Sequence, residues 1–406
     1  MKLLIISQHF YPEEVSTGLH MTELCSELEK KFNENDIDVL TGSAYKPYNF
    51  DNGKSNFKIK SKIYRLNGFG SKHGNLFSRF LFALGFTIPA VFWYIKNHRK
   101  YNIILMNTNP PTLYPIIGIL NLFFNKKVFL MMYDVYPNIL VALNKIKRYG
   151  LINIIWTKLE KFSLKYFTKI IVIGDDMNEI IKEKLSNNLH NKIEIIRNWA
   201  NSQHFKNNFL NENNFLKMNP NLNNKKLIIY SGTMGTTHNI EEVLELSNVF
   251  LNIDNSIHFV FIGGGSKFNF VKNFCENQAN CSVLPFQDYN LVPSILDSSI
   301  ACVVCLDSKF TGLSVPSKSY AILSAGKPII GFLEKNSEIG KMISENNLGV
   351  VFDKNTDINT RKIKLIKLVD SFEKHDSKTR INNFFSENYT LKIIAGKYYE
   401  LLTDTK

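Results

Sequence analysis

Short apolar stretches alternate with helical patterns along the whole chain. Strand candidates in the first half are 2–7, 37–41, 102–106, 127–132 and 169–173, and those in the second half are 227–231, 257–262, 281–285, 299–305 and 328–332. Continuous apolar runs rich in β-branched residues are typical of parallel strands that helices cover on both faces. The pattern therefore predicts an α/β architecture with two Rossmann-like, doubly wound parallel sheets.

An asparagine-rich stretch separates the two halves, because residues 205–226 show almost no periodicity. A chain of 406 residues suits two domains that face a cleft better than one core. We expect an N-terminal domain, a linker region, a C-terminal domain and a last helix. Their ranges are 1–200, 201–226, 227–385 and 386–406.

The segment 76–95 is apolar enough to span a bilayer, for which about 20 apolar residues suffice. Arg79 and Pro89 count against a span. Basic residues before and after the segment suit a helix that lies at a membrane interface. They are Lys72, His73, Lys96, His98, Arg99 and Lys100. Attachment to an anionic membrane surface through 72–100 is favoured over a buried core helix, and both over a true span.

The formal net charge of +13 indicates a polyanionic partner, which could be nucleic acid, anionic lipid or a phosphorylated substrate. The basic residues are spread over the chain and no nucleic-acid-reading motif is evident, so nucleic acid is disfavoured. The five cysteines form no paired framework, which indicates a reducing compartment. Cys302 and Cys305 lie in an apolar strand candidate, so we expect them in the core rather than on a metal.

Polar, glycine-containing loops follow the first strand of each predicted sheet. They cover residues 8–18, and residues 231–238 before a predicted helix at 240–250. Gly232 and Gly235 remove side chains where a diphosphate approaches the backbone, and the free amides of a helix start favour an anion.

Three other positions are candidates for binding. The triple glycine at 263–265 suits a nucleobase or ribose against bare backbone, and it also suits a tight turn. Ser317 and Lys318 begin a predicted helix, where a hydroxyl, an ammonium group and free amides can take an anion. Asp134 ends a buried strand, where a carboxylate either lines a ligand crevice or caps the next turn.

These blocks, in this order, resemble the family 4 glycosyltransferases of the GT-B fold, and among them the WbuB type of O-antigen and capsule synthesis. The blocks are 8–13 with Gly18, 134–137, 159–160 with 171–177, 197–199, 230–235, 261–265 and 316–328. The resemblance implies a retaining transfer from a nucleotide-sugar, such as a UDP-hexose or UDP-N-acetylhexosamine, to a lipid-linked oligosaccharide. It also implies no obligatory metal or cofactor, a last helix that crosses back to the first domain, and a location at the cytoplasmic face of the cell membrane.

The same resemblance implies that the N-terminal domain at 1–200 binds the acceptor and that the C-terminal domain at 227–385 binds the nucleotide-sugar. It also implies the site residues. It implies donor-binding roles for Gly18, Arg197, Gly232, Thr233, Met234, Gly235, Gly263, Gly265, Ser317 and Lys318. It implies acceptor-side roles for Tyr11, Glu13 and Asp134. Lys318 would stabilise the leaving diphosphate, and Asp134 would orient the acceptor hydroxyl.

Two departures keep other interpretations open. Leu313 and Ala321 stand where many relatives carry two glutamates, and Thr237 with His238 stands where a basic residue is usual. An inactive scaffold or anion-binding relative therefore remains an alternative, as does a nucleotide-sugar epimerase of the same fold.

Overall fold

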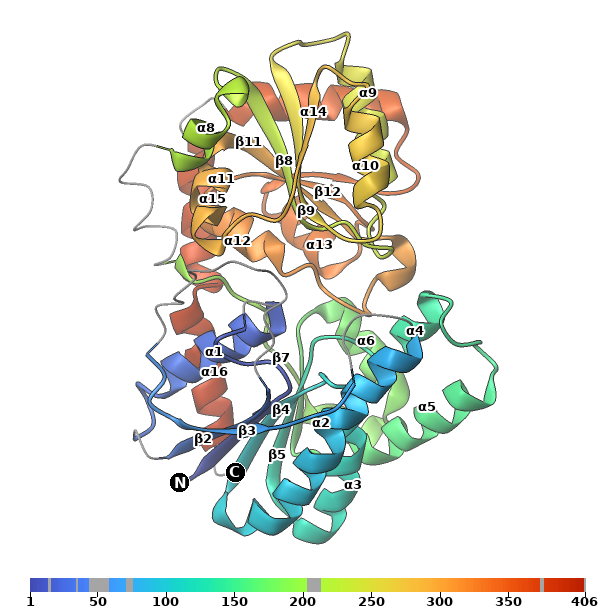
Figure 1. The fold of residues 1–406 in the computed structure, drawn as a ribbon, viewed down its shortest axis with the longest axis vertical. Coiled ribbons are helices and arrows are strands. Elements are labelled where there is room, and N and C mark those ends of the chain that lie inside the picture. The colour runs from blue at the N-terminus through green and yellow to red at the C-terminus, as the bar shows by residue number, and fades with distance from the viewer. Residues whose placement is uncertain are drawn as a thin grey trace. The chain divides into compact units, whose positions relative to one another are not determined.

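The computed structural model describes residues 1–13, 16–33, 36–43, 58–70, 76–202, 213–372 and 376–404. The chain forms two compact units (Figure 1). Unit 1 comprises Met1–Arg197, Gly312–Ser314 and Leu391–Lys406, and unit 2 comprises Asn198–Thr311 and Val315–Thr390. The parts of the predicted linker that the structure describes, 201–202 and 213–226, belong to unit 2, and the second contains α8 (Asn214–Met218).

Within the described residues, unit 1 has a seven-stranded parallel sheet in the order β3-β2-β1-β4-β5-β6-β7. Its strands are β1 (Leu3–Ser7), β2 (Ile37–Gly42), β3 (Lys62–Leu66), β4 (Ile103–Asn107), β5 (Lys127–Met132), β6 (Lys169–Val172) and β7 (Ile193–Ile195). The strands β1, β2 and β4 are buried along their whole length, which is the environment that continuous apolar runs predict. The edge strands β3 and β7 were not predicted.

Helices of unit 1 form two groups by their contacts. They are α1 (Ser16–Leu28), α2 (Leu76–Asn97), α3 (Leu113–Phe124), α4 (Asn138–Ala142), α5 (Leu151–Leu164), α6 (Asp175–Lys184) and α16 (Leu391–Thr403). The helix α1 packs against α16, whereas α3 contacts both α2 and α5 (Figure 1). The last helix therefore returns to the first domain, as expected.

The apolar segment 76–95 lies in α2, which has one buried and one exposed face. Phe86 and Tyr94 are buried, whereas Phe77 and Phe92 are exposed. By length and composition, Phe77–Lys100 could cross a membrane, with a mean hydropathy of 1.4 and 33% of the stretch buried. The two-faced pattern is neither that of a fully buried core helix nor that of a lone span. Lys72 and His73 lie outside the described residues.

A short segment, Gly312–Ser314, belongs to unit 1 although its neighbours in sequence belong to unit 2. The Leu313 carbonyl accepts a hydrogen bond from the Val135 amide at 2.9 Å, and Ser314 forms an antiparallel bridge with Asp134. Gly312 has φ +73°, and a Cβ there would lie 2.8 Å from the Asp176 carbonyl oxygen. Only glycine fits this position without displacing α6.

Unit 2 has, in its described part, a six-stranded parallel sheet in the order β10-β9-β8-β11-β12-β13. The strands are β8 (Lys226–Thr233), β9 (Ile257–Gly264), β10 (Cys281–Leu284), β11 (Ser299–Cys305), β12 (Ile329–Phe332) and β13 (Gly349–Phe352). Its helices besides α8 are α9 (Ile240–Phe250), α10 (Phe268–Cys275), α11 (Val292–Ser298), α12 (Lys318–Ser324), α13 (Glu338–Glu345), α14 (Ile358–Phe372) and α15 (Asp376–Asn388). The edge strand β13 was not predicted.

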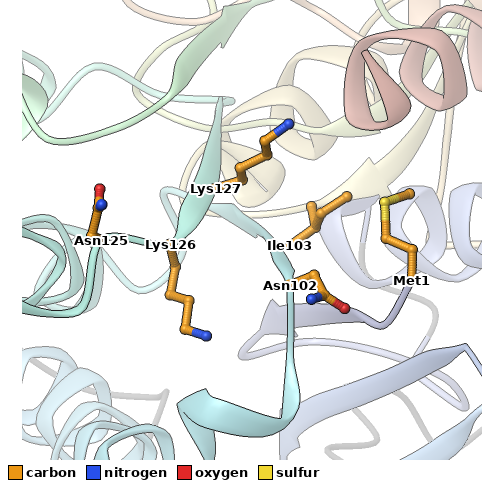
Figure 2. A pocket seen from close by; sticks show the side chains of 6 residues that line it. All are labelled: Met1, Asn102, Ile103, Asn125, Lys126 and Lys127. Carbon is orange, nitrogen blue, oxygen red and sulfur yellow. The ribbon is translucent and has the colours of Figure 1, made fainter. Parts of the chain in front are cut away.

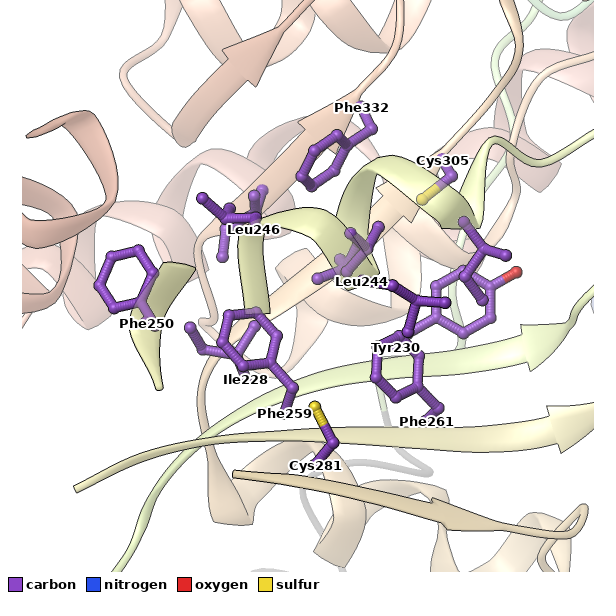
Figure 3. Packing of buried hydrophobic residues seen from close by; sticks show 14 of the residues in the cluster. Ile228, Tyr230, Leu244, Leu246, Phe250, Phe259, Phe261, Cys281, Cys305 and Phe332 are labelled. Atoms are coloured by element: carbon purple, nitrogen blue, oxygen red, sulfur yellow. The ribbon is translucent and has the colours of Figure 1, made fainter. Parts of the chain in front are cut away.

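The core of unit 2 lies between its sheet and the helices α9, α10 and α14. Tyr230, Phe259 and Phe332 pack there with side chains of α9 (Figure 3). Cys281 and Cys305 lie in the same cluster, and Cys302 is also buried. The prediction that Cys302 and Cys305 are core residues is confirmed.

Candidate functional site

Two glycine loops at the carboxyl ends of β8 and β9 are locked together in unit 2. Gly263 has φ +145°, and a Cβ there would lie 1.9 Å from the Gly232 carbonyl oxygen. Gly265 has φ +126°, and its Cβ would lie 2.7 Å from the Met234 carbonyl oxygen. The Met234 amide donates to the Gly264 carbonyl at 2.6 Å. Gly263 and Gly265 thus have a packing role that does not depend on a ligand.

Gly232 differs from Gly263 and Gly265, because its backbone lies next to the side chain of Lys318. Gly232 has φ +138°, and a Cβ there would lie 3.7 Å from Lys318 Nζ. That Nζ lies 3.6 Å from the centroid of the Tyr230 ring. It is buried and has no hydrogen-bond partner among the described residues. A buried ammonium group without an acceptor is costly, so this position favours an anion.

Electrostatics around Lys318 agree with an anion site. Burial lowers the pKa of Lys318 to about 8, against the opposing influence of Cys305 and Cys302. The pKa of His238 is lowered to about 3, first by burial and then by Lys318 and Lys267. His238 is therefore neutral at physiological pH and adds no charge of its own.

The remaining predicted donor-side residues of unit 2 lie around this position with different exposures. Thr233 is exposed at the end of β8, and its carbonyl accepts from the Tyr230 hydroxyl at 2.7 Å. Gly235 lies in the loop before α9, and Ser317 precedes α12. Met234 has a fully buried side chain in the core of unit 2. Its amide donates to the Gly264 carbonyl and its carbonyl accepts from the Lys267 amide at 2.9 Å. The buried side chain and the engaged backbone of Met234 therefore do not support the predicted donor contact.

Two predicted donor-binding residues lie in unit 1 instead. Gly18 lies inside α1, which begins at Ser16, and its carbonyl accepts from Thr22 Oγ1 at 2.7 Å. The loop after β1 is therefore shorter than the predicted 8–18. Arg197 forms an ion pair with Asp175 at 2.7 Å, so its guanidinium is already engaged.

The loop after β1 contains a buried contact between an imidazole and a carboxylate, and its His9 was not among the predicted site residues. His9 Nδ1 and Glu13 Oε2 lie 2.6 Å apart, and both side chains are buried. The guanidinium of Arg65 donates to the Tyr11 carbonyl. Glu13 therefore holds the His9 ring in place, and Tyr11 is anchored through its backbone. The signal for His9 was present, because His9 and Glu13 are four residues apart directly after a strand.

Asp134 lies just beyond β5, as predicted. Its amide donates to Thr108 Oγ1 at 3.4 Å, next to the end of β4. Burial raises the pKa of Asp134 to about 6. A carboxyl group that titrates near physiological pH at the carboxyl edge of a parallel sheet is a candidate for chemistry.

The two positions at which many relatives carry glutamates, Leu313 and Ala321, lie in different units. Leu313 is buried in unit 1, and Ala321 lies in α12 of unit 2. Of the nearby serines, Ser319 is fully buried, and its hydroxyl has no hydrogen-bond partner among the described residues. In the described part of the chain, no group of three or more His, Cys, Asp or Glu residues could hold a metal ion.

Hollows found elsewhere contain none of these residues. One of about 630 Å³ lies at the amino ends of β4 and β5 (Figure 2). It is lined by Met1, Asn102, Ile103, Asn125, Lys126 and Lys127. Another, of about 510 Å³, lies along β13, α14 and α15. Ligands of open parallel sheets bind at the carboxyl ends of strands, so the first hollow is on the opposite edge.

Comparison with known proteins assigns the class of unit 2. The family Glycosyl transferases group 1 matches residues 212–382. The Pseudomonas aeruginosa protein named "Probable glycosyltransferase WbjE" is 24% identical over 100% of this chain and 99% of its own length.

Solved structures share the fold of the whole chain. Anabaena Alr3699/HepE in complex with UDP has a TM-score of 0.69 at 12% identity, covering 99% of this chain and 100% of that one. WaaG, a glycosyltransferase involved in lipopolysaccharide biosynthesis, has a TM-score of 0.67 at 11% identity, covering 99% of both chains. The two units thus have the GT-B fold, and the chain, with its Glycosyl transferases group 1 domain, is a glycosyltransferase.

Proposed function

We propose that this protein is a retaining glycosyltransferase that moves a hexose or N-acetylhexosamine from a nucleotide-sugar, most simply a UDP-sugar, to a lipid-linked glycan. The product would belong to a bacterial surface polysaccharide, at the cytoplasmic face of the cell membrane. HepE was solved with UDP, and WaaG acts in lipopolysaccharide biosynthesis, which supports the donor class and the pathway class.

One observation carries the donor side of the proposal: the buried, unpaired Nζ of Lys318 beside the bare backbone of Gly232. A diphosphate placed there would gain an ammonium partner and those amides of the loop at 232–235 that the protein leaves free, of which the Met234 amide is not one, because it donates to the Gly264 carbonyl. The free amides at the start of α9 add a partial positive charge. In this proposal these groups neutralise the departing diphosphate, and no metal or other cofactor is required.

The acceptor side is assigned to unit 1. Asp134, in its ionised form, would orient the acceptor hydroxyl and stabilise positive charge that develops on the sugar. The acceptor attacks from the face on which the diphosphate departs, and a phosphate oxygen of the donor takes the hydroxyl proton. No protein nucleophile is needed. The pair of His9 and Glu13 would shape the acceptor side next to the end of β1.

The test is calorimetric titration of the purified protein with UDP, GDP and dTDP and their sugars. Lys318→Ala should weaken binding of the preferred nucleotide by about ten- to a hundredfold, the value of one hydrogen bond to a charged group. Wild-type affinity should fall as the pH rises past about 8, because Lys318 then loses its proton, and the variant should lose this dependence.

Lys367→Ala is the matched control, because Lys367 is an exposed lysine on α14 of the same unit. It should bind as the wild type does. Unchanged affinity in Lys318→Ala would remove the diphosphate role. Conversion of the donor without an acceptor would point to the epimerase, and a rate that EDTA abolishes would contradict the metal-free mechanism.

A further inference from the structure

Helix α5 exposes most of its apolar side chains and buries a glutamate. Tyr149 in the preceding loop is 83% exposed, and Leu151 and Ile152 at the helix start are 71% and 65% exposed. Ile154, Ile155, Leu159 and Phe162 are also exposed. The opposite face buries Glu160 and Ser163 beside Leu164. The exposed face of this helix is therefore far more apolar than that of an ordinary surface helix of a water-soluble domain.

Specific contacts hold α5 in this orientation. The Glu160 carboxylate forms a buried ion pair with Lys184 of α6 and accepts from the Tyr114 hydroxyl of α3 at 3.1 Å. Gly118 lets α3 approach closely, because a Cβ there would lie 2.8 Å from the Ser163 carbonyl oxygen. Rotation of the helix to bury its apolar face would break this ion pair, which is expensive for buried charges. The outward apolar face is thus a fixed property of the fold.

Positive charge accompanies the apolar face. Lys158, Lys161 and Lys165 are exposed and follow each other at helical spacing, beside the line of Ile155, Leu159 and Phe162. Lys145, Lys147 and Arg148 precede the helix and are exposed as well. Glu160, the one carboxylate in 144–165, is buried. The exposed charge of this region is therefore entirely positive.

Exposed apolar side chains also occur on α3, which contacts α5, and on α2, which contacts α3. Phe123 of α3 and Phe77 and Phe92 of α2 are each more than three-fifths exposed. The helix α3 contacts both α2 and α5, and Figure 1 shows α5 at the margin of unit 1. Apolar side chains over three neighbouring helices exceed the scattered hydrophobics that are normal on a protein surface.

We propose that Tyr149 and the exposed face of α5, together called the α5 surface, dock this protein on an anionic lipid bilayer. The Leu, Ile and Phe side chains enter the acyl boundary, Tyr149 lies at the headgroup level, and the lysines contact lipid phosphates. A second copy fits less well, because a symmetric contact would bring the lysines of both copies together. The inference deepens the membrane part of the proposed function and moves the main contact from 72–100 to α5.

Flotation of the full chain with vesicles tests this proposal. Wild-type protein should bind vesicles of phosphatidylcholine with about 30% phosphatidylglycerol and bind pure phosphatidylcholine weakly. The double variant Leu151→Ser/Ile152→Ser should lose at least about tenfold in vesicle affinity. Its matched control is Phe270→Ser/Ile363→Ser, which changes two residues of unit 2 that are 52% and 53% exposed. The control should bind as the wild type does.

Two further variants sharpen the result. The triple variant Lys158→Gln/Lys161→Gln/Lys165→Gln should lose the preference for anionic vesicles. The double variant Phe77→Ser/Phe92→Ser in α2 should reduce vesicle affinity less than Leu151→Ser/Ile152→Ser does. The proposal is overturned if wild-type protein does not bind the vesicles, or if only Phe77→Ser/Phe92→Ser lowers vesicle affinity. It is also overturned if the effect of Leu151→Ser/Ile152→Ser is only the loss of a dimer that forms without lipid. UDP affinity measured without vesicles should be the same in all these variants, so failure of the docking surface is distinguishable from failure of the donor site.

Discussion

Seventeen of the twenty-one large hydrophobic side chains that are exposed in the described residues belong to unit 1, and four belong to unit 2. Those of unit 1 concentrate on α2, α3 and α5, whereas those of unit 2 lie on separate elements. Unit 2 instead buries the ammonium group of Lys318 without a hydrogen-bond partner among the described residues. In unit 1 the buried Lys184 is paired with Glu160.

This difference between exposed apolar surface in unit 1 and a buried charge in unit 2 indicates a different kind of partner for each unit. An apolar surface exposed to water and a charged group buried without a counter-charge are both energetically unfavourable until a partner binds. Unit 1 would be completed by an apolar phase, and unit 2 by an anion.

The largest effect is expected from Glu160→Ala, which tests whether α5 depends on its buried charges. Removal of this carboxylate leaves Lys184 and the Tyr114 hydroxyl buried without it, so the free energy of unfolding should fall by about 3–5 kcal/mol. Urea denaturation followed by tryptophan fluorescence measures this. Glu179→Ala, which removes an exposed ion pair with Lys182 at 2.9 Å, should change it by no more than about 0.5 kcal/mol. Equal effects of the two substitutions would contradict the stabilising role of the buried pair and, with it, the contrast between the paired Lys184 of unit 1 and Lys318 of unit 2.

A second prediction concerns the locked glycine loops of unit 2. Gly263→Ala places a methyl group 1.9 Å from the Gly232 carbonyl oxygen at φ +145°. The free energy of unfolding should fall by about 3 kcal/mol, because strain and a backbone clash combine. Nucleotide affinity should fall with it, since Gly232 carries the proposed diphosphate contact. Calorimetry of unfolding and of UDP binding would measure both losses. If Gly263→Ala kept its UDP affinity, the packing of the two glycine loops would not be needed for the anion site.

The third prediction uses the pH dependence of Asp134. Its pKa is raised in the folded state, so its contribution to stability is fully present below the unfolded pKa near 3.8 and is lost as the pH rises through about 6. Asp134→Asn should therefore gain up to about 3 kcal/mol over wild type above pH 6 and little near pH 4. Transferase activity, which in the proposed mechanism needs the carboxylate, should fall in wild type below pH 6.

Asp370→Asn, an exposed position on α14, should alter neither profile. A flat difference in stability between wild type and Asp134→Asn from pH 4 to 8 would contradict the burial of this carboxyl group.

The smallest effect is expected from Gly396→Ala in α16. A Cβ at Gly396 meets nothing within 4 Å, so alanine should raise the free energy of unfolding by up to about 1 kcal/mol through better helix propensity. Thermal unfolding measures the gain. A loss of stability there would mean that the packing of α16 in unit 1 is tighter than described.

The sequence predicted the central strands well and missed three edge strands. Strands that are buried on both faces carry continuous apolar runs, as β1 and β11 do. The edge strand β3 reads Lys-Ile-Tyr-Arg-Leu and is largely exposed, so its side chains need not be apolar. The strands β7 and β13 have three and four residues, which gives too short a window for alternation to be visible.

The candidate site was predictable in its loops but not in its contacts. Glycines after β8 are visible in the sequence, because the backbone geometry there demands them. That Lys318 lies over the Tyr230 ring, or that Glu13 is engaged by His9, depends on tertiary packing. Periodicity likewise identifies an apolar face on α5, but it does not reveal whether that face meets protein or solvent.

The two segments that rejoin unit 1 late in the chain constrain the order of its assembly during synthesis. Gly312–Ser314 and α16 are made after most or all of unit 2. A nascent chain that has just emerged through Arg197 lacks the partner of α1 and the segment that pairs beyond β5. Although domains generally fold from the N-terminus as translation proceeds, unit 1 cannot be completed until the ribosome has reached the last helix.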